Sequence, residues 1–150
     1  MVAGRLAHAT PAGSPWHHAT VPGAEPLGRA ALVGFVASSD LDRSRAFYEG
    51  VLGFEVTEQD GFACVLKAGS STVRITLVQE VLSAPYTVLG WEVDNLADAV
   101  DSLAARGVSF LRFEGMDQDA RCILTAPGGD RVTWFADPDG HVLSLTQPRP

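Results

Sequence analysis

Two stretches of the chain repeat one order of apolar and polar positions. In each, an apolar run of strand length leads to a helix-capping residue, Asp40 or Asn95, and the two caps lie 55 positions apart. An amphipathic stretch follows and ends at a glycine, and alternating runs separated by short turns come next. A unit that occurs twice predicts a domain of two similar modules related by pseudo-two-fold symmetry.

The first repeat predicts one helix and four strands. The helix spans 41–52, begins after Asp40 and ends at Gly53, and it places Leu41 and Tyr48 on one face. The strands are expected at 31–37, 54–58, 62–67 and 72–79. Short turns between the last three strands favour antiparallel hairpins.

The second repeat has the clearest helical periodicity of the chain. Its helix spans 96–106, closes at Gly107 and carries Leu96, Val100 and Leu103 at helical spacing. Strands are expected at 87–93, 108–113, 119–125, 131–136 and 141–146. This repeat therefore has one strand more than the βαβββ order of the first.

Residues 1–30 differ in composition from the rest, being rich in Ala, Gly and Pro with few charges. Such a segment has little to bury, so we expect a disordered tail that includes the His17–His18 pair, followed by one domain over 31–150. No apolar run approaches the ~18 residues of a membrane span, and no apolar core of a secretory signal follows the start. These features predict a cytoplasmic protein.

The net charge of −7 argues against nucleic acids and anionic membranes as partners. It suits a cationic ligand, and it equally suits an acidic surface that only aids solubility. The two cysteines, Cys64 and Cys122, form no CxxC pair, and each lies in an apolar run. We expect them to be reduced, buried thiols.

Two motifs occur together with the repeat. Phe47-Tyr48 is followed by Leu52-Gly53 at the end of the first helix, and Asp137-Pro138-Asp139-Gly140 precedes the last strand. In this combination the chain, over residues 31–147, resembles the vicinal oxygen chelate superfamily of glyoxalases, bleomycin-resistance proteins and extradiol dioxygenases. The resemblance implies an α+β fold of two βαβββ modules, whose curved mixed sheets surround a central cavity, and a homodimer. Residues 31–150 would form the single glyoxalase/bleomycin-resistance-like domain.

Enzymes of that family hold a divalent metal through His, Gln or Glu side chains on the first and last strands of each module. The four positions correspond here to Val33, Thr76, Val88 and Ser144. Valine cannot ligate a metal, and neutral hydroxyls are weak ligands. The chain thus departs from the family pattern at all four positions, and we expect no metal or other cofactor at this place.

Strand alternation extends the predicted cavity lining from these positions. If they face inward, so do Phe35, Arg74 and Glu92, and Trp134 is a candidate for stacking on a flat ligand. The predicted ligand-binding residues are Phe35, Arg74, Thr76, Val88, Glu92, Trp134 and Ser144. The opposite face would carry Leu32, Val36, Ile75, Leu77, Leu89, Trp91, Val93, Leu143 and Leu145 against the helices. An alternative stays open for each of these roles. Arg74 and Glu92 would pair with each other instead of binding a ligand, and Trp134 would pack in the core instead of stacking on one.

Two functions follow from these features. The first is a binding protein that holds a small hydrophobic or cationic molecule in its cavity without a metal. The alternative is a lyase, isomerase or dioxygenase that is metal-independent, or that binds metal at a site not inherited from the family. Glu92 is the best catalytic candidate for that alternative. A third reading is an accessory domain whose cavity is filled by its own side chains.

Overall fold

The computed structural model describes residues 27–150. The expected tail and its histidines therefore lie almost entirely outside the described residues. Leu27–Arg29 forms a 3₁₀ turn, η1, and Ala31–Pro150 forms one compact unit. Among the described residues, no helix is long and apolar enough to cross a membrane.

The first module has the predicted βαβββ order. Its elements are β1 (Val33–Ser38), α1 (Leu41–Arg45), η2 (Ala46–Val51), β2 (Glu55–Gln59), β3 (Ala63–Ala68) and β4 (Ser71–Leu77). The sheet order is β1-β4-β3-β2, in which β1 and β4 are parallel and the other pairs antiparallel. The Asp40 side chain accepts from the Arg43 amide and caps α1 as expected. The predicted helix over 41–52 is continuous, but its second half, η2, is π-helical.

The second module repeats this arrangement and confirms the two-module α+β fold. It contains β5 (Thr87–Glu92), α2 (Leu96–Ala105), β6 (Leu124–Thr125), β7 (Arg131–Ala136) and β8 (Val142–Gln147). The sheet order β5-β8-β7-β6 matches that of the first module, again with its first and last strands paired in parallel. Asn95 caps α2 through the Asp98 amide.

The strand predicted at 108–113 is wrong, because only an isolated bridge between Phe110 and Phe135 forms there. The buried side chain of Gln118 explains the difference. Its Oε1 accepts from the Phe113 amide at 2.7 Å, and its Nε2 donates to the Leu111 and Cys122 carbonyls at 3.0 and 2.8 Å. The Gln118 side chain thus forms hydrogen bonds with backbone groups that would otherwise pair with a neighbouring strand. The strand predicted at 119–125 shrinks to the two residues of β6.

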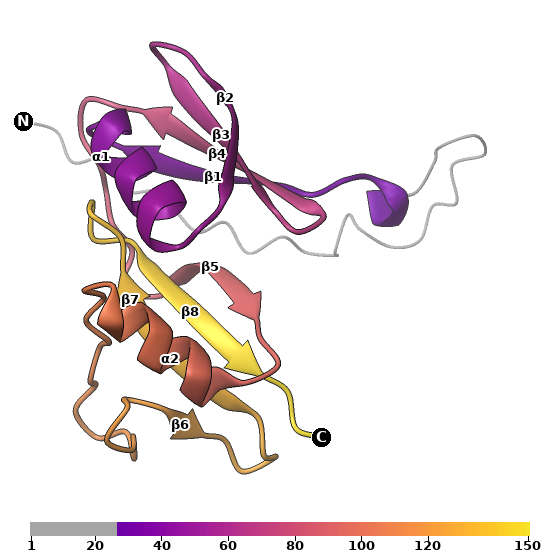
Figure 1. Ribbon diagram of the computed structural model, residues 1–150, viewed down its shortest axis with the longest axis vertical. Helices are drawn as coiled ribbons and strands as arrows, with labels where there is room; N and C mark the ends of the chain where they lie inside the picture. The colour runs from indigo at the N-terminus through magenta and orange to yellow at the C-terminus, as the bar shows by residue number, and fades with distance from the viewer. Residues whose placement is uncertain (1–26) are drawn as a thin grey trace, which may run out of the picture. The chain divides into compact units, whose positions relative to one another are not determined.

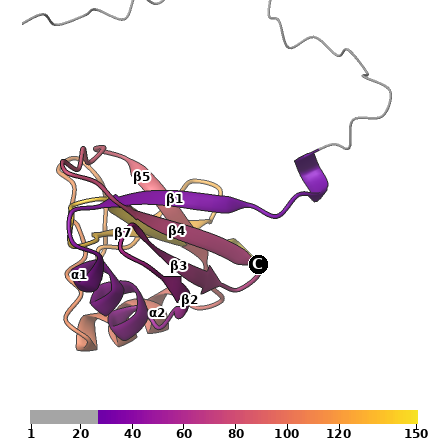
Figure 2. The same ribbon diagram turned by 90° about the horizontal axis from the view of Figure 1, so that it is seen from above.

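Both helices lie on the same side of the two sheets (Figures 1 and 2). The side of each sheet that faces the helices supplies the core, which includes Val36, Leu66, Ile75, Leu143 and Leu145. The predicted alternation along the strands is thereby confirmed for most positions. Leu32 and Leu77 are exceptions, being 74% and 42% exposed, because they lie at strand ends.

Polar contacts join the two modules at the turn between β7 and β8. The Tyr48 hydroxyl donates to Asp137 Oδ2 at 2.8 Å, and both residues are buried. Asp139 accepts from the Ser39 hydroxyl at 2.6 Å and pairs with Arg43 at 3.0 Å. The two motifs that carry the family resemblance therefore meet in space, and they connect the first helix to the second module.

Apolar contacts complete the joint between the modules. The rings of Phe54 and Trp91 stack with centroids 5.1 Å apart. A Cβ atom at Gly34 of β1 would lie 3.1 Å from Leu89 Cδ2 of β5, so glycine allows these edge strands to approach. The sheets stay separate and do not close into a barrel. The side of each sheet away from the helices is here called its open face, because no helix of residues 31–150 covers it.

Candidate functional site

The open face of the first sheet presents an aromatic side chain beside a cation. Phe35 of β1 is paired with Arg74 of β4, which in turn is paired with Val65 of β3. Phe35 is 68% exposed and Val33 is 42% exposed, although both are apolar and lie on β1. Thr76 lies on the same face, two residues beyond Arg74.

The open face of the second sheet carries the other predicted residues. Gly90 of β5 is paired with Ser144 of β8, which is paired with Trp134 of β7. A Cβ atom on Gly90 would lie 2.6 Å from the Ser144 hydroxyl oxygen, so the serine occupies the space that a side chain at 90 would need. Val88 and Glu92 flank Gly90 on β5 and are exposed.

The structure thus separates the predicted site residues into two groups. Phe35, Arg74 and Thr76 share the first open face, and the second carries Val88, Glu92, Trp134 and Ser144. Within the described residues, Arg74 and Glu92 form no ion pair with each other. The rings of Trp134 and Phe113 lie nearly perpendicular with centroids 5.3 Å apart, so part of the Trp134 ring belongs to a structural contact.

Strand register corrects one correspondence between the modules. Ser144 is opposite Gly90, and the equivalent pair in the first module is Arg74 opposite Phe35. The counterpart of Ser144 is therefore Arg74, whereas Thr76 lies opposite Ala37. The turn between β3 and β4 spans 69–70, whereas the turn between β7 and β8 spans 137–141, so the two modules are not aligned by a constant spacing at their last strands.

The residues at the family's metal positions do not fit a divalent metal. Val33 and Val88 have no lone pair to donate, and the guanidinium of Arg74 would repel a cation. Ser144 offers one neutral hydroxyl. Across residues 27–150, no group of three or more His, Cys, Asp or Glu side chains lies close enough to hold a metal ion.

The aspartates and the histidine around the β7–β8 turn have structural partners. Burial and then the Asp137 carboxylate raise the pKa of Tyr48 well above its ordinary value. Burial opposes the ionisation of Asp139, but hydrogen bonds from Ser39 outweigh it and lower the pKa of Asp139. The buried His141 lies within 2.8 Å of the Ala37 carbonyl through Nε2. These groups hold the modules together and do not face the open sides of the sheets.

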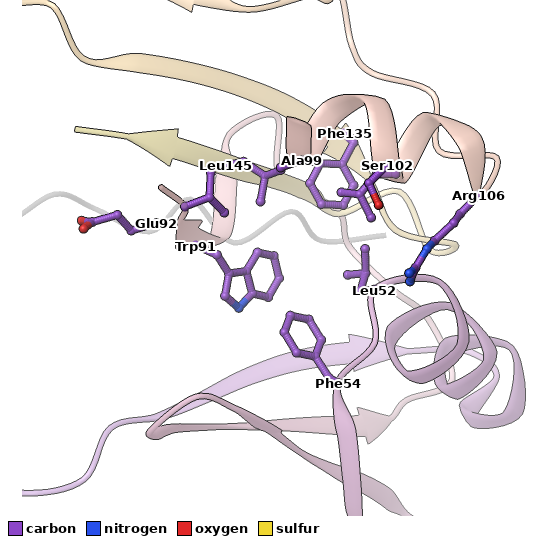
Figure 3. A pocket seen from close by; sticks show the side chains of 11 residues that line it. Leu52, Phe54, Trp91, Glu92, Ala99, Ser102, Arg106, Phe135 and Leu145 are labelled. Carbon is purple, nitrogen blue, oxygen red and sulfur yellow. The ribbon is translucent and has the colours of Figure 1, made fainter. Parts of the chain in front are cut away.

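A cavity of about 400 Å³ lies on the helix side, where the two modules meet. Its lining comprises Leu52, Phe54, Trp91, Glu92, Val93, Ala99, Ser102, Leu103, Arg106, Phe135 and Leu145 (Figure 3). Only Glu92 belongs to the predicted site. The sequence pattern assigned Trp91, Val93 and Leu145 to the helix-facing side, but nothing in it indicated a gap between the modules.

The comparisons with known proteins agree with this architecture. The model of the Glyoxalase/Bleomycin resistance protein/Dioxygenase superfamily matches residues 18–145, and the chain belongs to that superfamily. No curated protein sequence matches the chain.

Three solved structures illustrate the similarity. A bleomycin resistance determinant encoded on the transposon Tn5 has a TM-score of 0.63 and 21% identity, over 79% of this chain and 98% of that one. A lactoylglutathione lyase from Agrobacterium tumefaciens has a TM-score of 0.62 and 17% identity, over 79% and 93%. A glyoxalase/bleomycin resistance protein/dioxygenase from Alicyclobacillus acidocaldarius has a TM-score of 0.60 and 17% identity, over 81% and 93%. At these identities the likeness establishes the fold alone.

Proposed function

We propose that this protein binds a small hydrophobic molecule on the open faces of its sheets without using the divalent metal of its family. One observation carries the proposal: Phe35 is 68% exposed in the middle of a strand, and Val33 beside it is 42% exposed. Neighbouring exposed apolar side chains on one sheet face mark a surface that a ligand or another protein covers.

A second copy of the chain is the covering partner that we propose. No helix of residues 31–150 covers either open face, and two copies brought together would enclose a space between these faces. That space would be lined by Phe35, Val88 and Trp134, with Arg74 and Glu92 as its charged groups. A mostly apolar lining with a few convergent polar groups is typical of small-molecule sites.

The charged groups define the ligand chemistry. Arg74 would bind a carboxylate or phenolate of the ligand, and Glu92 would bind a cationic group. Glu92 makes no side-chain hydrogen bond to any described residue, so its carboxylate is free to accept one. A hydrophobic cation is the ligand that best suits Glu92 and the overall charge of −7.

The test measures binding to the full chain purified without an affinity tag. Tetraphenylphosphonium serves as the hydrophobic cation and 1-anilinonaphthalene-8-sulfonate as the hydrophobic anion, each titrated by fluorescence or calorimetry. Phe35→Ala should weaken binding of tetraphenylphosphonium by about tenfold or more because the aromatic contact is lost. Phe62→Ala is the matched control, since Phe62 is 77% exposed but lies outside both open faces. Equal effects of the two variants would argue against the site.

Two further measurements address the metal and catalysis. Elemental analysis of a His17→Ala, His18→Ala variant should find no tightly held metal, and one equivalent per subunit would overturn the metal-free proposal. If a reaction is found, Glu92→Gln distinguishes the enzymatic alternative. Catalysis by Glu92 predicts lost turnover with binding retained, whereas a binding protein has no turnover to lose.

A further inference from the structure

The cavity on the helix side has the size and composition of a separate ligand site. Its volume of about 400 Å³ is within the range typical of small-molecule pockets. Leu52 and Phe54 of the first module and Trp91 and Leu103 of the second contribute to its walls. All four are only partly buried, so residues 27–150 cover their apolar surface incompletely.

One wall of the cavity is aromatic. Phe54 and Trp91 come from different modules, and their rings stack at 5.1 Å with an angle of 28° between the planes. Figure 3 shows this pair beside Leu52, below the helix that carries Ala99. A flat or aliphatic group would find a continuous apolar wall here.

One end of the cavity is cationic. Ser102 and Arg106 are one helical turn apart, and Figure 3 shows them together at the end of the cavity near Leu52. Arg106 Nη1 donates to the Val51 carbonyl at 3.0 Å, which positions the guanidinium. Arg106 pairs with no carboxylate among residues 27–150, in a chain with 18 acidic and 11 basic residues.

The acidic residue of the cavity is remote from this cation. Glu92 lies at the opposite end of the row of side chains in Figure 3. An anionic ligand group would therefore be attracted to one end only, and a second anionic group at the far end would be repelled. This separation of charge favours ligands with a single negative group.

We propose that the cavity binds a hydrophobic monocarboxylate. Its apolar body would lie against Phe54, Trp91 and Leu103, and its carboxylate would accept hydrogen bonds from Arg106 and Ser102. Apart from Glu92 at the edge of β5, the cavity shares no residue with the open faces. This site and the proposed open-face site can therefore be tested independently.

Isothermal titration of the full chain with octanoate and with 3-phenylpropionate tests the proposal. The affinity of each acid should be at least about tenfold higher than that of its neutral amide, because the amide cannot form the charge-assisted hydrogen bonds. Arg106→Met should weaken binding of the acids to the level of the amides. Arg149→Met is the matched control, since Arg149 also donates to a backbone carbonyl, that of Gly128, but lies outside the cavity.

A second variant keeps the test decisive if Arg106→Met fails to fold. Ala99→Phe fills the cavity from α2 while keeping Arg106 in the sequence, and it should abolish binding of both acids. Phe35→Ala should leave the acids' affinity unchanged. Loss of binding in Phe35→Ala with retention in Ala99→Phe would overturn the proposal and place the acids on the open face. Absence of binding by either acid would also overturn it.

Discussion

Replacing Tyr48 by phenylalanine removes one hydroxyl from the joint between the two modules. That hydroxyl donates to Asp137 Oδ2 at 2.8 Å, with Tyr48 1% and Asp137 6% exposed. The other carboxylate oxygen, Oδ1, accepts from the amides of Asp139 and His141 and is unaffected. Oδ2 has no other protein donor among the described residues, so the variant leaves it without a partner.

The expected loss of stability follows from this geometry. A hydrogen bond to a charged group contributes about 1.5–3 kcal/mol, and an unpartnered buried acceptor carries a similar desolvation penalty. Phenylalanine retains the ring, including its edge-to-face contact with Phe47 at 5.2 Å, so no large cavity forms. We therefore expect Tyr48→Phe to lower the free energy of unfolding by about 2 kcal/mol.

Urea denaturation followed by circular dichroism at one fixed protein concentration measures this loss. For a slope of about 2 kcal/mol/M, the midpoint should fall by roughly 1 M. Tyr86→Phe makes the same chemical change at the only other tyrosine, which is 67% exposed, and it should leave the midpoint unchanged. An unchanged slope would show that the denatured state is not altered.

A double-mutant cycle with Asp137→Asn isolates the interaction between the two side chains. If the hydrogen bond joins the modules as described, the two changes should be strongly non-additive. If Tyr48→Phe costs no more than Tyr86→Phe, or if the effects of Tyr48→Phe and Asp137→Asn simply add, the hydrogen bond does not stabilise the joint between the modules.

Three further predictions concern charge, packing and thiol reactivity. The pKa of Asp139 is lower in the folded protein than in the unfolded chain. Ionised Asp139 therefore stabilises the fold above the unfolded pKa of about 3.9, and this stabilisation is lost as the pH falls through the folded pKa. In thermal melts, Asp139→Asn should reduce the fall of the melting temperature at acid pH. Gly90→Ala should lower the free energy of unfolding by about 1 kcal/mol, because the new methyl group crowds Ser144. Adding Ser144→Ala should restore most of this stability in urea titrations, and additive effects of the two changes would contradict the contact. Burial raises the pKa of the Cys64 thiol. A disulfide reagent should therefore label the partly exposed Cys122 first under native conditions, and equal labelling rates of the two cysteines would contradict the burial of Cys64.

The sequence alone determined the features that depend on local periodicity. Asp40 and Asn95 cap helices because their side chains reach amides three residues ahead, and this geometry is encoded within a few residues. Two-residue alternation likewise sorted Val36 and Ile75 to the core and Phe35 to the open face. The repeat of these local signals was sufficient to predict the two-module fold.

Local signals failed where a side chain competes with a strand partner for the backbone. The apolar run over 108–113 resembles a strand, but Gln118 bonds its backbone groups from within a loop. The register of β4 against β1 also depends on turn geometry, which is why Arg74 and not Thr76 corresponds to Ser144.

The joint between the modules depends on packing between residues that are far apart in the sequence. Tyr48 and Asp137 are 89 positions apart, and no periodicity links them. Phe54, Trp91 and Arg106 come together for the same reason: the packing of one module against the other leaves a space that neither repeat contains alone. Sequence patterns describe which face of an element is apolar, whereas the cavity arises from how two such faces fit, which is a property of the packed pair.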